Sequence, residues 1–460
     1  MTSGPVQALS DSDRAAIKAA AESLLPDAER LLIDLINIDT TNPPGLNYPQ
    51  IASVLGNFLS LKGYEVEQIL VPLELHPELV PFSDLPRVNV FARLKPESTN
   101  DKGRVIHFNG HVDVVPVGDT EQWTHPPFQA TVSNGVIYGR GVSDMKGGIV
   151  AQVSIRNPIN SRVACNSGEI FAIEALRKAG IPIRGTIEQS GVVDEETTGN
   201  RNAGMGYLVE KGYISHGKQD AVIITEPLNT TNVCLGHRGT IWGRIEFKGL
   251  ASHGCTPQRG VNALLHASLV VAEAYRTITP QVKELTDDRV IPPEAQAASL
   301  TFTVLNSGTN TNTVPASAVL EFDRRLVPGE TLDKARKEIY SVLEEVKKQI
   351  GEDFHAEYSE LYSTDPIWVG DSKDSTAQEL IGHVKNAIKS VLDVEPGVVC
   401  SPGSDDQRFV VRDARIDSCV VYGPGNIRNV HNKNESLSLE DLRAAIEVMA
   451  IFTAEFLNGA

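Results

Sequence analysis

Apolar residues recur at helical spacing in residues 31–36, on one face of a helix that the pattern predicts within the first 40 residues. The polar and proline-rich residues 40–45 then end this helix. A second helix is predicted over residues 48–62 and ends at Gly63. Strands are predicted for three short apolar segments, residues 64–70, 89–94 and 105–109. This alternation of helices and strands predicts an α/β sheet with helices on its faces.

The pattern changes after Pro227, where a second group of elements begins. The group contains predicted strands at residues 240–247, 300–304 and 318–323, and predicted helices at residues 261–277 and 332–349. We interpret it as a small α+β domain inserted into the α/β domain. The chain then returns to the first domain, with predicted helices at residues 375–392 and 439–457 and a strand at residues 418–422. The expected boundaries are residues 1–235 and 361–460 for the first domain, and 236–360 for the inserted one.

The length of 460 residues is enough for two or three domains of about 150 residues each. Acidic residues outnumber basic ones by 59 to 42, and the net charge of −17 disfavours binding to nucleic acid or to anionic membranes. No apolar run approaches the ~18 residues of a membrane span, and the N-terminal sequence lacks a signal-peptide pattern. The five cysteines are widely spaced, which favours free thiols in a reducing compartment. We therefore expect a cytoplasmic protein that binds neither nucleic acid nor membranes.

The first candidate site residues follow the predicted strand at residues 105–109. His111 and Asp113 are two positions apart, so at strand spacing their side chains point to the same side. A metal-binding histidine usually has its orientation fixed by a nearby carboxylate or carbonyl. A buried histidine that is hydrogen-bonded to a neighbouring acid gives the same pattern, so both interpretations stay open for this pair.

The second candidate is Asp144, in the glycine-rich sequence of residues 139–148. Gly139 and Gly141 resemble the start of a dinucleotide-binding fingerprint, but Asp144 occupies the place of its third glycine. The same segment fails at its last position as a nucleophile elbow. What remains is an acid in a tight turn between a strand and a helix.

Further acids and a histidine follow the ends of other segments. Glu195 and Glu196 belong to an acidic run that, taken alone, is typical of a solvated turn. Glu226 comes directly after a buried-type strand, at the kind of position where α/β sheets bind ligands. Near the C-terminus, His431 opens the sequence His-x-x-Asn-Glu, which ends at Glu435.

In order, these pieces are His-x-Asp, Gly-x-Gly-x-x-Asp, Glu-Glu, Glu-Pro and His-x-x-Asn-Glu, and the ordered set resembles the M20 metallopeptidase family. This family includes acetylornithine deacetylase, succinyl-diaminopimelate desuccinylase, aminoacylase and carboxypeptidase G. The resemblance covers residues 27–457. It implies a zinc-exopeptidase-like catalytic α/β domain, with a mixed sheet flanked by helices, and an inserted α+β lid or dimerisation domain. It also implies two divalent metal ions, Zn²⁺ or Co²⁺, and a homodimer formed through the inserted domain.

The resemblance assigns a role to each residue of these motifs. His111 would bind one metal ion and His431 the other, with Asp144 bridging both. Glu226 would complete the site of His111, and Glu196 the site of His431. Imidazole and carboxylate ligands suit zinc or cobalt on chemical grounds alone. Two such ions polarise an amide carbonyl and lower the pKa of a water between them.

Glu195 would then act as the general base, which takes a proton from that water and passes it to the leaving nitrogen. Asp113 would support His111 without binding a metal ion itself. The resemblance also implies that the peptide bond after the bridging aspartate, Asp144–Met145, is cis.

The inserted domain adds candidates for substrate binding and catalysis. His253 matches a lid histidine that helps to stabilise the oxyanion and, in dimeric members, reaches the neighbouring subunit's site; a histidine that serves only its own turn is the alternative. Arg325 matches a substrate-binding position, and its guanidinium suits a substrate carboxylate. A surface ion pair explains Arg325 equally well, so both interpretations stay open. The other substrate-binding candidates are Asn312, Gly403 and Arg408.

These expectations define a metal-dependent amidohydrolase that cleaves the amide of an N-acyl amino acid or a similar small amide bearing a carboxylate, as a deacetylase or desuccinylase does. A dipeptidase or carboxypeptidase of the same family is the alternative enzyme. A catalytically impaired binding or scaffold protein is the alternative from another class, because an insertion interrupts the expected helix after Asp144.

The insertion is the 17-residue segment 153–169, and its composition disfavours a helix. Without it, Ile149, Ile170 and Ile173 would fall on one apolar helical face. The segment begins with a valine codon, which starts GT, and ends with a glutamate codon, which can be GAG; these are the usual intron boundaries. We therefore interpret it as a translated intron, with a genuine surface loop as the alternative.

Overall fold

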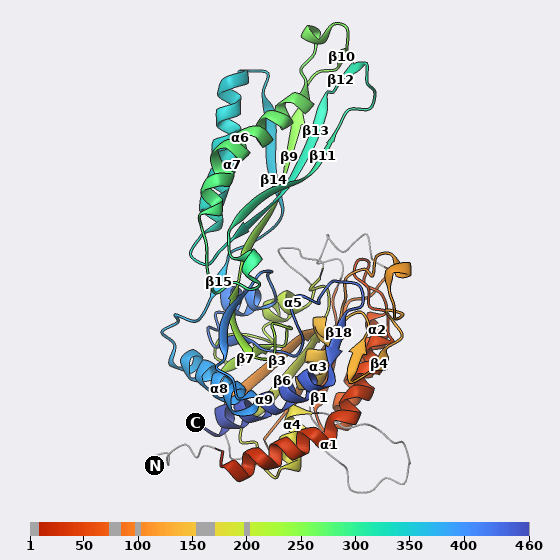
Figure 1. The fold of residues 1–460 in the computed structure, drawn as a ribbon, viewed down its shortest axis with the longest axis vertical. Coiled ribbons are helices and arrows are strands. Elements are labelled where there is room, and N and C mark those ends of the chain that lie inside the picture. Colours follow the sequence, from red (N-terminus) through yellow and green to blue (C-terminus); the bar gives the residue numbers. More distant parts are fainter. Residues whose placement is uncertain (1–8, 73–83, 97–102, 153–170, 197–202, 460) are drawn as a thin grey trace. The chain divides into compact units, whose positions relative to one another are not determined.

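The computed structural model describes residues 9–72, 84–96, 103–152, 171–196 and 203–459. The chain divides into two compact units, and Figure 1 traces both in sequence colours. The first unit comprises Met1–Leu235, Val369–Val399 and Phe409–Ala460, and the second comprises Gly236–Trp368 and Cys400–Arg408. The segment 153–169, which the sequence marks as an insertion, lies outside the described residues.

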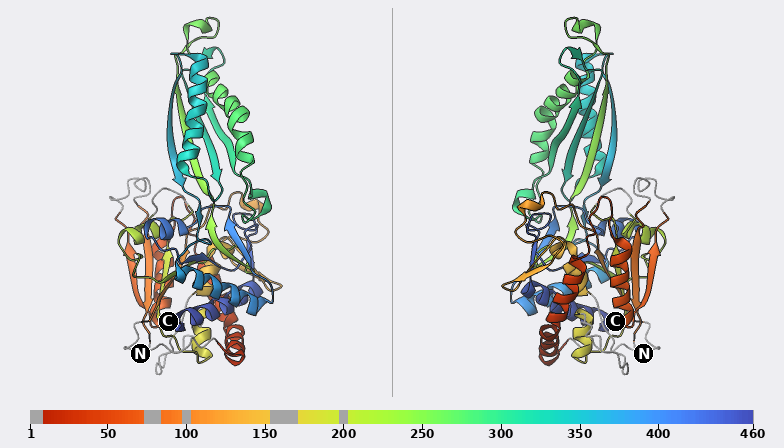
Figure 2. Two further views of the ribbon diagram at one scale, coloured as in Figure 1. Left: turned by 90° about the vertical axis from the view of Figure 1, so that its left-hand side faces the viewer. Right: turned by 90° about the vertical axis from the view of Figure 1, so that its right-hand side faces the viewer.

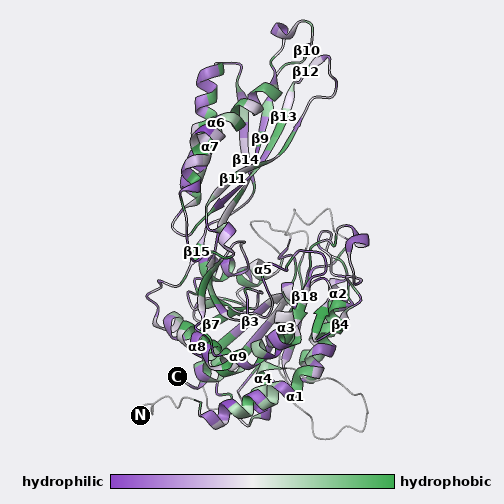
Figure 3. Ribbon diagram, viewed as in Figure 1, coloured by the Kyte–Doolittle hydropathy of each residue, from purple (hydrophilic) through white to green (hydrophobic). Residues whose placement is uncertain are grey.

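A mixed sheet forms the centre of the first unit, with strands in the order β1-β2-β6-β3-β7-β17-β8. Strands β6, β3, β7 and β17 run parallel, whereas β1 and β2 are antiparallel at one edge. Strand β7 is buried throughout, as expected for a central parallel strand, and Figure 3 shows its apolar character. The strands are β1 (Glu65–Leu70), β2 (Val88–Leu94), β3 (Val105–His111), β6 (Thr186–Val192), β7 (Ala221–Ile224), β8 (Asn232–His237), β16 (Gly397–Ser401), which pairs with β8, and β17 (Cys419–Val421). The predicted mixed sheet is confirmed.

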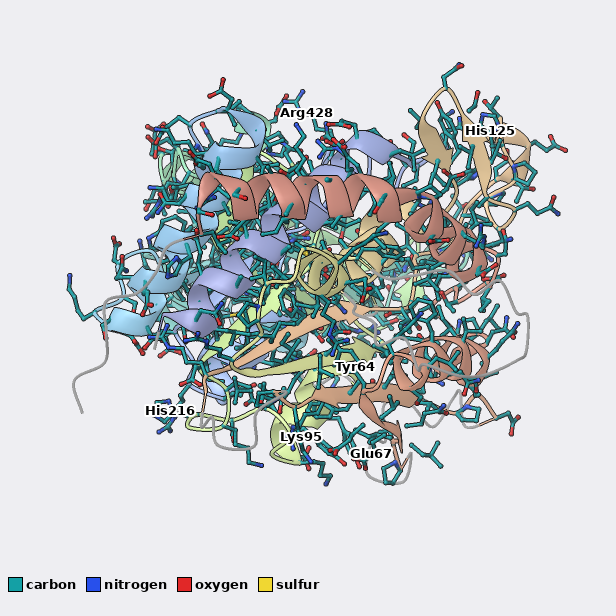
Figure 4. All side chains as sticks on the ribbon, turned by 90° about the horizontal axis from the view of Figure 1, so that it is seen from below. Tyr64, Glu67, Lys95, His125, His216 and Arg428 are labelled. Carbon is teal, nitrogen blue, oxygen red and sulfur yellow. The ribbon has the colours of Figure 1, made fainter. Side chains whose placement is uncertain are left out.

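Helices flank this sheet, and α9 (Leu439–Asn458) is buried along most of its length. It packs against α1, α3, α4 and α8, and Figure 4, seen from below, shows α1 crossing it. Ser438 caps its first turn by accepting a hydrogen bond from the backbone N–H of Asp441 at 2.9 Å. The other helices are α1 (Asp11–Ile36), α2 (Tyr48–Leu61), α3 (Gly147–Gln152), α4 (Ala172–Lys178), α5 (Met205–Glu210) and α8 (Ser375–Leu392). Among the described residues, no helix combines the length and apolarity needed to cross a membrane.

A small antiparallel sheet in the first unit holds the glycine-rich turn in place. Its strands are β4 (Thr131–Ser133), β5 (Val136–Tyr138) and β18 (Ser436–Ser438), in the order β18-β5-β4. Strand β5 leads into the turn at residues 139–148, and β18 follows the late histidine motif. Two motifs that are far apart in the sequence are therefore joined by backbone pairing.

The second unit is an antiparallel sheet in the order β11-β13-β9-β14, with α6 (Ala263–Lys283) and α7 (Leu332–Ile350) packed against it. Figures 1 and 2 place both helices on the same face. The strands of this sheet are β9 (Gly239–Lys248), β11 (Ser299–Ser307), β13 (Ser317–Leu326) and β14 (His355–Thr364). Strand β10 (Ser252–His253) pairs with β12 (Thr313–Val314), and β15 (Ile367–Trp368) pairs with β8. The predicted α+β domain is confirmed. It continues past residue 360, because β14 pairs with β9.

Candidate metal centre

Most of the candidate ligands lie at the carboxyl ends of three neighbouring parallel strands in the first unit's sheet. His111 is the last residue of β3, the acidic pair 195–196 follows β6, and Glu226 follows β7. Because β3 lies between β6 and β7, their carboxyl ends meet where α/β sheets bind ligands. Asp144 reaches this place from the turn before α3, and His431 from the loop before β18.

The carboxylate of Asp144 lies between the two histidines. Its Oδ1 is 3.0 Å from Nε2 of His111, and its Oδ2 is 3.1 Å from Nε2 of His431. Each imidazole has a further carboxylate beside it: Glu226 Oε1 is 3.3 Å from His111, and Glu196 Oε2 is 3.0 Å from His431. The arrangement is therefore symmetric about Asp144, with one histidine and one glutamate on each side.

Asp113 fixes two neighbouring parts of this centre. Its backbone oxygen is 3.0 Å from Nδ1 of His111, and its carboxylate Oδ1 is 3.6 Å from the same atom, which leaves Nε2 facing Asp144. The carboxylate also accepts hydrogen bonds from the backbone N–H groups of Glu195, at 3.3 Å, and Glu196, at 3.1 Å. It thus aligns both glutamates while it holds the histidine ring.

The glycine-rich turn brings Asp144 into place by close backbone approach. Gly141 adopts a φ of 84°, in the left-handed region that favours glycine. A Cβ on Gly148 would lie 2.0 Å from the backbone oxygen of Thr225, next to Glu226, so only glycine lets α3 pack this closely. The Asp144–Met145 peptide bond is cis, as the resemblance implied.

The electrostatics of the site show how strongly its groups interact. Burial opposes the charged imidazole of His111, but Glu226 and Asp144 raise its pKa well above the usual value. Burial also opposes the charge on His431, yet hydrogen bonds to Asp144 and Glu196 raise its pKa to about 11. Burial, and then the charge of Asp144, raises the pKa of Glu196. The two imidazoles and the carboxylates beside them therefore interact strongly, and divalent cations bound here would supply positive charge to the same carboxylates.

Two groups of described residues converge closely enough to hold metal ions. They are His111, Asp144 and Glu196, and His111, Glu195 and Glu226; within each group the ligand atoms lie within 4.8 Å of one another. Imidazole nitrogens and carboxylate oxygens are donors that suit zinc or cobalt. The residues present therefore fit the ions that the sequence motifs indicate.

Two of the lid candidates lie side by side in the second unit. His253 pairs with Thr313 across β10 and β12, and Gly254 N–H donates to the backbone oxygen of Asn312 at 2.6 Å. His253 is exposed, and its Nδ1 accepts a hydrogen bond from the backbone N–H of Cys255 at 3.1 Å. Because Nδ1 accepts this bond, the neutral ring carries its proton on Nε2, which can then act as a donor.

The other candidates in the second unit differ in their surroundings. The Nε of Arg325 donates to both carboxylate oxygens of Asp323, at 2.8 and 3.0 Å, so the ion pair that the sequence left open is present. Arg408 is buried, and its guanidinium lies 5.9 Å from the ring centroid of Tyr362. Gly403, in the loop after β16, has open space where a Cβ would point.

Sequence reasoning missed a buried cluster directly behind the two glutamates. Asp194 accepts hydrogen bonds from Tyr48 Oη at 2.9 Å, Arg87 Nε at 3.0 Å and Asn42 Nδ2 at 3.1 Å. The amide of Asn42 also donates to Asp113 at 2.9 Å. The only sequence signal was the position of Asp194, immediately before the glutamate pair.

Comparison with known families finds matches to two segments of the chain. Residues 107–157 match the model of peptidase family M20/M25/M40, and residues 235–351 match the peptidase dimerisation domain that bears the M20 name. The M20 resemblance is confirmed. Both models are M20 peptidase models, so these two segments are of the M20 type, and M20 peptidases are hydrolases.

Solved structures share the fold of this protein along nearly the whole chain. The di-peptidase Dug1p from Saccharomyces cerevisiae superposes with a TM-score of 0.72 at 16% identity, covering 97% of this chain and 99% of that one. The M20 family metallo-carboxypeptidase Sso-CP2 from Sulfolobus solfataricus gives 0.68 at 19% identity, covering 93% and 99%. The Bacillus subtilis YXEP protein, described as a dinuclear metal-binding M20 peptidase, gives 0.60 at 15% identity, covering 95% and 100%.

Proposed function

We propose that this protein is a two-metal hydrolase that cleaves the amide bond of an N-acyl amino acid or a similar small amide bearing a carboxylate. The observation that carries the proposal is the position of Asp144, whose two oxygens lie 3.0 and 3.1 Å from two different histidines. His111 and Glu226 would hold one ion, and His431 and Glu196 the other. When bound, zinc or cobalt ions would act as Lewis acids toward the amide carbonyl.

The residues around the ions would each have a separate role in the reaction. Glu195, with its backbone held by Asp113, would accept a proton from the attacking water and deliver it to the leaving nitrogen. Asp113 would keep the ring of His111 in the orientation that presents Nε2 to the centre. In the second unit, His253 would donate to the developing oxyanion. Asn312, Arg325, Gly403 and Arg408 remain proposed substrate-binding residues.

Removal of metal is the direct test of this proposal. Chelation should abolish hydrolysis, and Zn²⁺ or Co²⁺ should restore it. Asp144→Asn should lower both the metal content and the rate, because one residue serves both ions. Asp413→Asn, at an exposed Asp413–Arg412 pair, is the matched control and should keep both. Full activity in a metal-free preparation, confirmed by elemental analysis, would contradict the assignment.

A dipeptidase or carboxypeptidase is the second candidate function. It is favoured by two structural neighbours, which are described as a di-peptidase and as a metallo-carboxypeptidase. Both candidates use the same centre, so they differ in the substrate alone. Rates on N-acyl amino acids and on free dipeptides, measured with one metal-loaded preparation, separate them. A chain that holds no metal and hydrolyses neither class would instead be a scaffold protein.

Replacing His253 tests the proposed role of the second unit. His253→Ala should lower kcat by about 10²–10³-fold, the typical cost of one lost oxyanion donor. The metal content should not change, because the ligands lie in the first unit. His355→Ala removes another exposed histidine of the second unit and should leave kcat as it is. An unchanged kcat for His253→Ala would remove this residue from the mechanism.

A further inference from the structure

The carboxylate of Glu435 is fully buried and accepts four hydrogen bonds. Its Oε1 accepts from the backbone N–H groups of Ser143, at 2.9 Å, and Asp144, at 3.0 Å. Its Oε2 accepts from the backbone N–H of Gly141, at 3.1 Å, and from Nη1 of Arg140, at 2.8 Å. One side chain thus holds the turn that carries the central aspartate.

The same side chain connects this turn to the late histidine. Glu435 is four residues after His431, and its own backbone oxygen accepts from Gly139 N–H at 3.0 Å. Arg140 completes the link, because its Nη2 reaches the backbone oxygen of His431 at 3.5 Å. The strand that follows, β18, pairs with β5 at Ser436 and Tyr138. The turn and the histidine loop are therefore fixed to each other and not only to the sheet.

The chemistry of the four partners requires a carboxylate at this position. All four are donors, and an ionised carboxylate has two acceptor oxygens and no donor. A glutamine would direct its NH₂ group at two of these donors whichever way its amide turned, and the buried N–H groups would lose their partner. An aspartate is one methylene shorter, so it would not reach Arg140 and the turn together.

The two halves of the metal centre depend on this link to different extents. His111 is the last residue of β3 and Glu226 follows β7, so the central sheet places both of them. His431 comes from a loop whose backbone is held through Arg140. If the contacts of Glu435 and Arg140 are weakened, the ion beside His431 should therefore lose affinity before the ion beside His111.

We propose that Glu435 and Arg140 are positioning residues that set the affinity of the ion held by His431, Glu196 and Asp144. This inference rests on the proposed two-metal function. We call this ion the second ion and the one held by His111 and Glu226 the first. The second ion should bind tightly only while the buried Glu435–Arg140 pair holds the turn of Asp144 and the loop of His431 in their present relative positions.

The experiment compares Glu435→Gln with the same substitution at a second glutamate–arginine pair of the first unit, whose glutamate is also buried. Glu447 lies on α9 and is paired with Arg443 at 2.6 Å, and Glu447→Gln is the control. Bound zinc is counted by elemental analysis, and each affinity is measured by competition with a chromogenic chelator. Glu435→Gln should keep the first ion and weaken the second by roughly 10–100-fold, the usual cost of losing a residue that orients a metal ligand. The control should bind both ions with wild-type affinity.

Excess metal gives an independent readout, because a positioning defect is corrected by mass action. The kcat of Glu435→Gln should rise toward the wild-type value as Zn²⁺ is added, with little change in KM. Arg140→Lys, which keeps the charge but loses the forked geometry, should weaken the same ion by a smaller factor, and it serves if Glu435→Gln does not fold.

Three results would overturn the inference. They are wild-type affinity for both ions in Glu435→Gln or Arg140→Lys, equal loss of both ions, or the same loss in the Glu447→Gln control. A wild-type chain that binds fewer than two ions would instead refute the two-metal function on which the inference rests. The wild-type stoichiometry thus separates the two failures.

Discussion

Replacing Glu195 with glutamine should lower kcat by about 10²–10⁴-fold, the usual contribution of a general base. Its side chain belongs with His111 and Glu226 to a group of possible ligand atoms within 4.8 Å of one another. A glutamine has nearly the same shape but cannot take a proton from water. The backbone hydrogen bond from residue 195 to Asp113 does not depend on the side chain, so the site should otherwise keep its form.

The adjacent glutamate provides the control for this experiment. Glu196 Oε2 lies 3.0 Å from Nε2 of His431, so Glu196→Gln should lose metal as well as rate. Glu195→Gln should keep both ions and a KM close to that of the wild type. If Glu195→Gln loses an ion and Glu196→Gln keeps both, the two glutamates have exchanged roles. A normal kcat for Glu195→Gln would exclude it as the base.

Much of the fold follows from local patterns that the sequence displays. The predicted helix at residues 375–392 coincides with α8 (Ser375–Leu392), since its apolar spacing is regular and Asp374 caps its start. Strand β14 (His355–Thr364) was missed, although its residues alternate in burial at the period of a strand. The order of the strands is set by pairing between distant segments, which periodicity does not encode.

The metal ligands could be predicted because their order along the chain matches a family, whereas their supports could not. Asp113 was assigned only to His111, yet its carboxylate also accepts from the backbone of the glutamate pair. Arg87 and Asp194 form a buried ion pair at 3.0 Å, and 107 positions separate them in the sequence. Such pairs bring together residues whose local sequence has no chemical signature, so only the folded chain reveals them.

Deleting the 17-residue segment 153–169 should give a more stable and more active protein. The helices on either side, α3 (Gly147–Gln152) and α4 (Ala172–Lys178), contact each other and both pack against α9. At the end of α3, the backbone oxygen of Gln152 accepts a hydrogen bond from Gln189 Nε2 at 2.6 Å. The deletion would join the two helices behind Asp144 and remove two helix ends, where backbone groups in general have no partner within the helix.

The deletion should raise both the Tm of thermal unfolding and the kcat. Each kcal/mol of added stability raises Tm by roughly 2–4 °C in a domain of 150–250 residues, so thermal unfolding detects a modest effect. The kcat should rise as well, because α3 begins directly after the turn that carries Asp144. The control is a chain in which the segment is replaced by a glycine-serine linker of the same length. That chain should stay close to the unaltered one, since it leaves the helices separate. Transcripts that all retain the segment, together with a deleted chain that fails to fold, would establish it as a genuine loop.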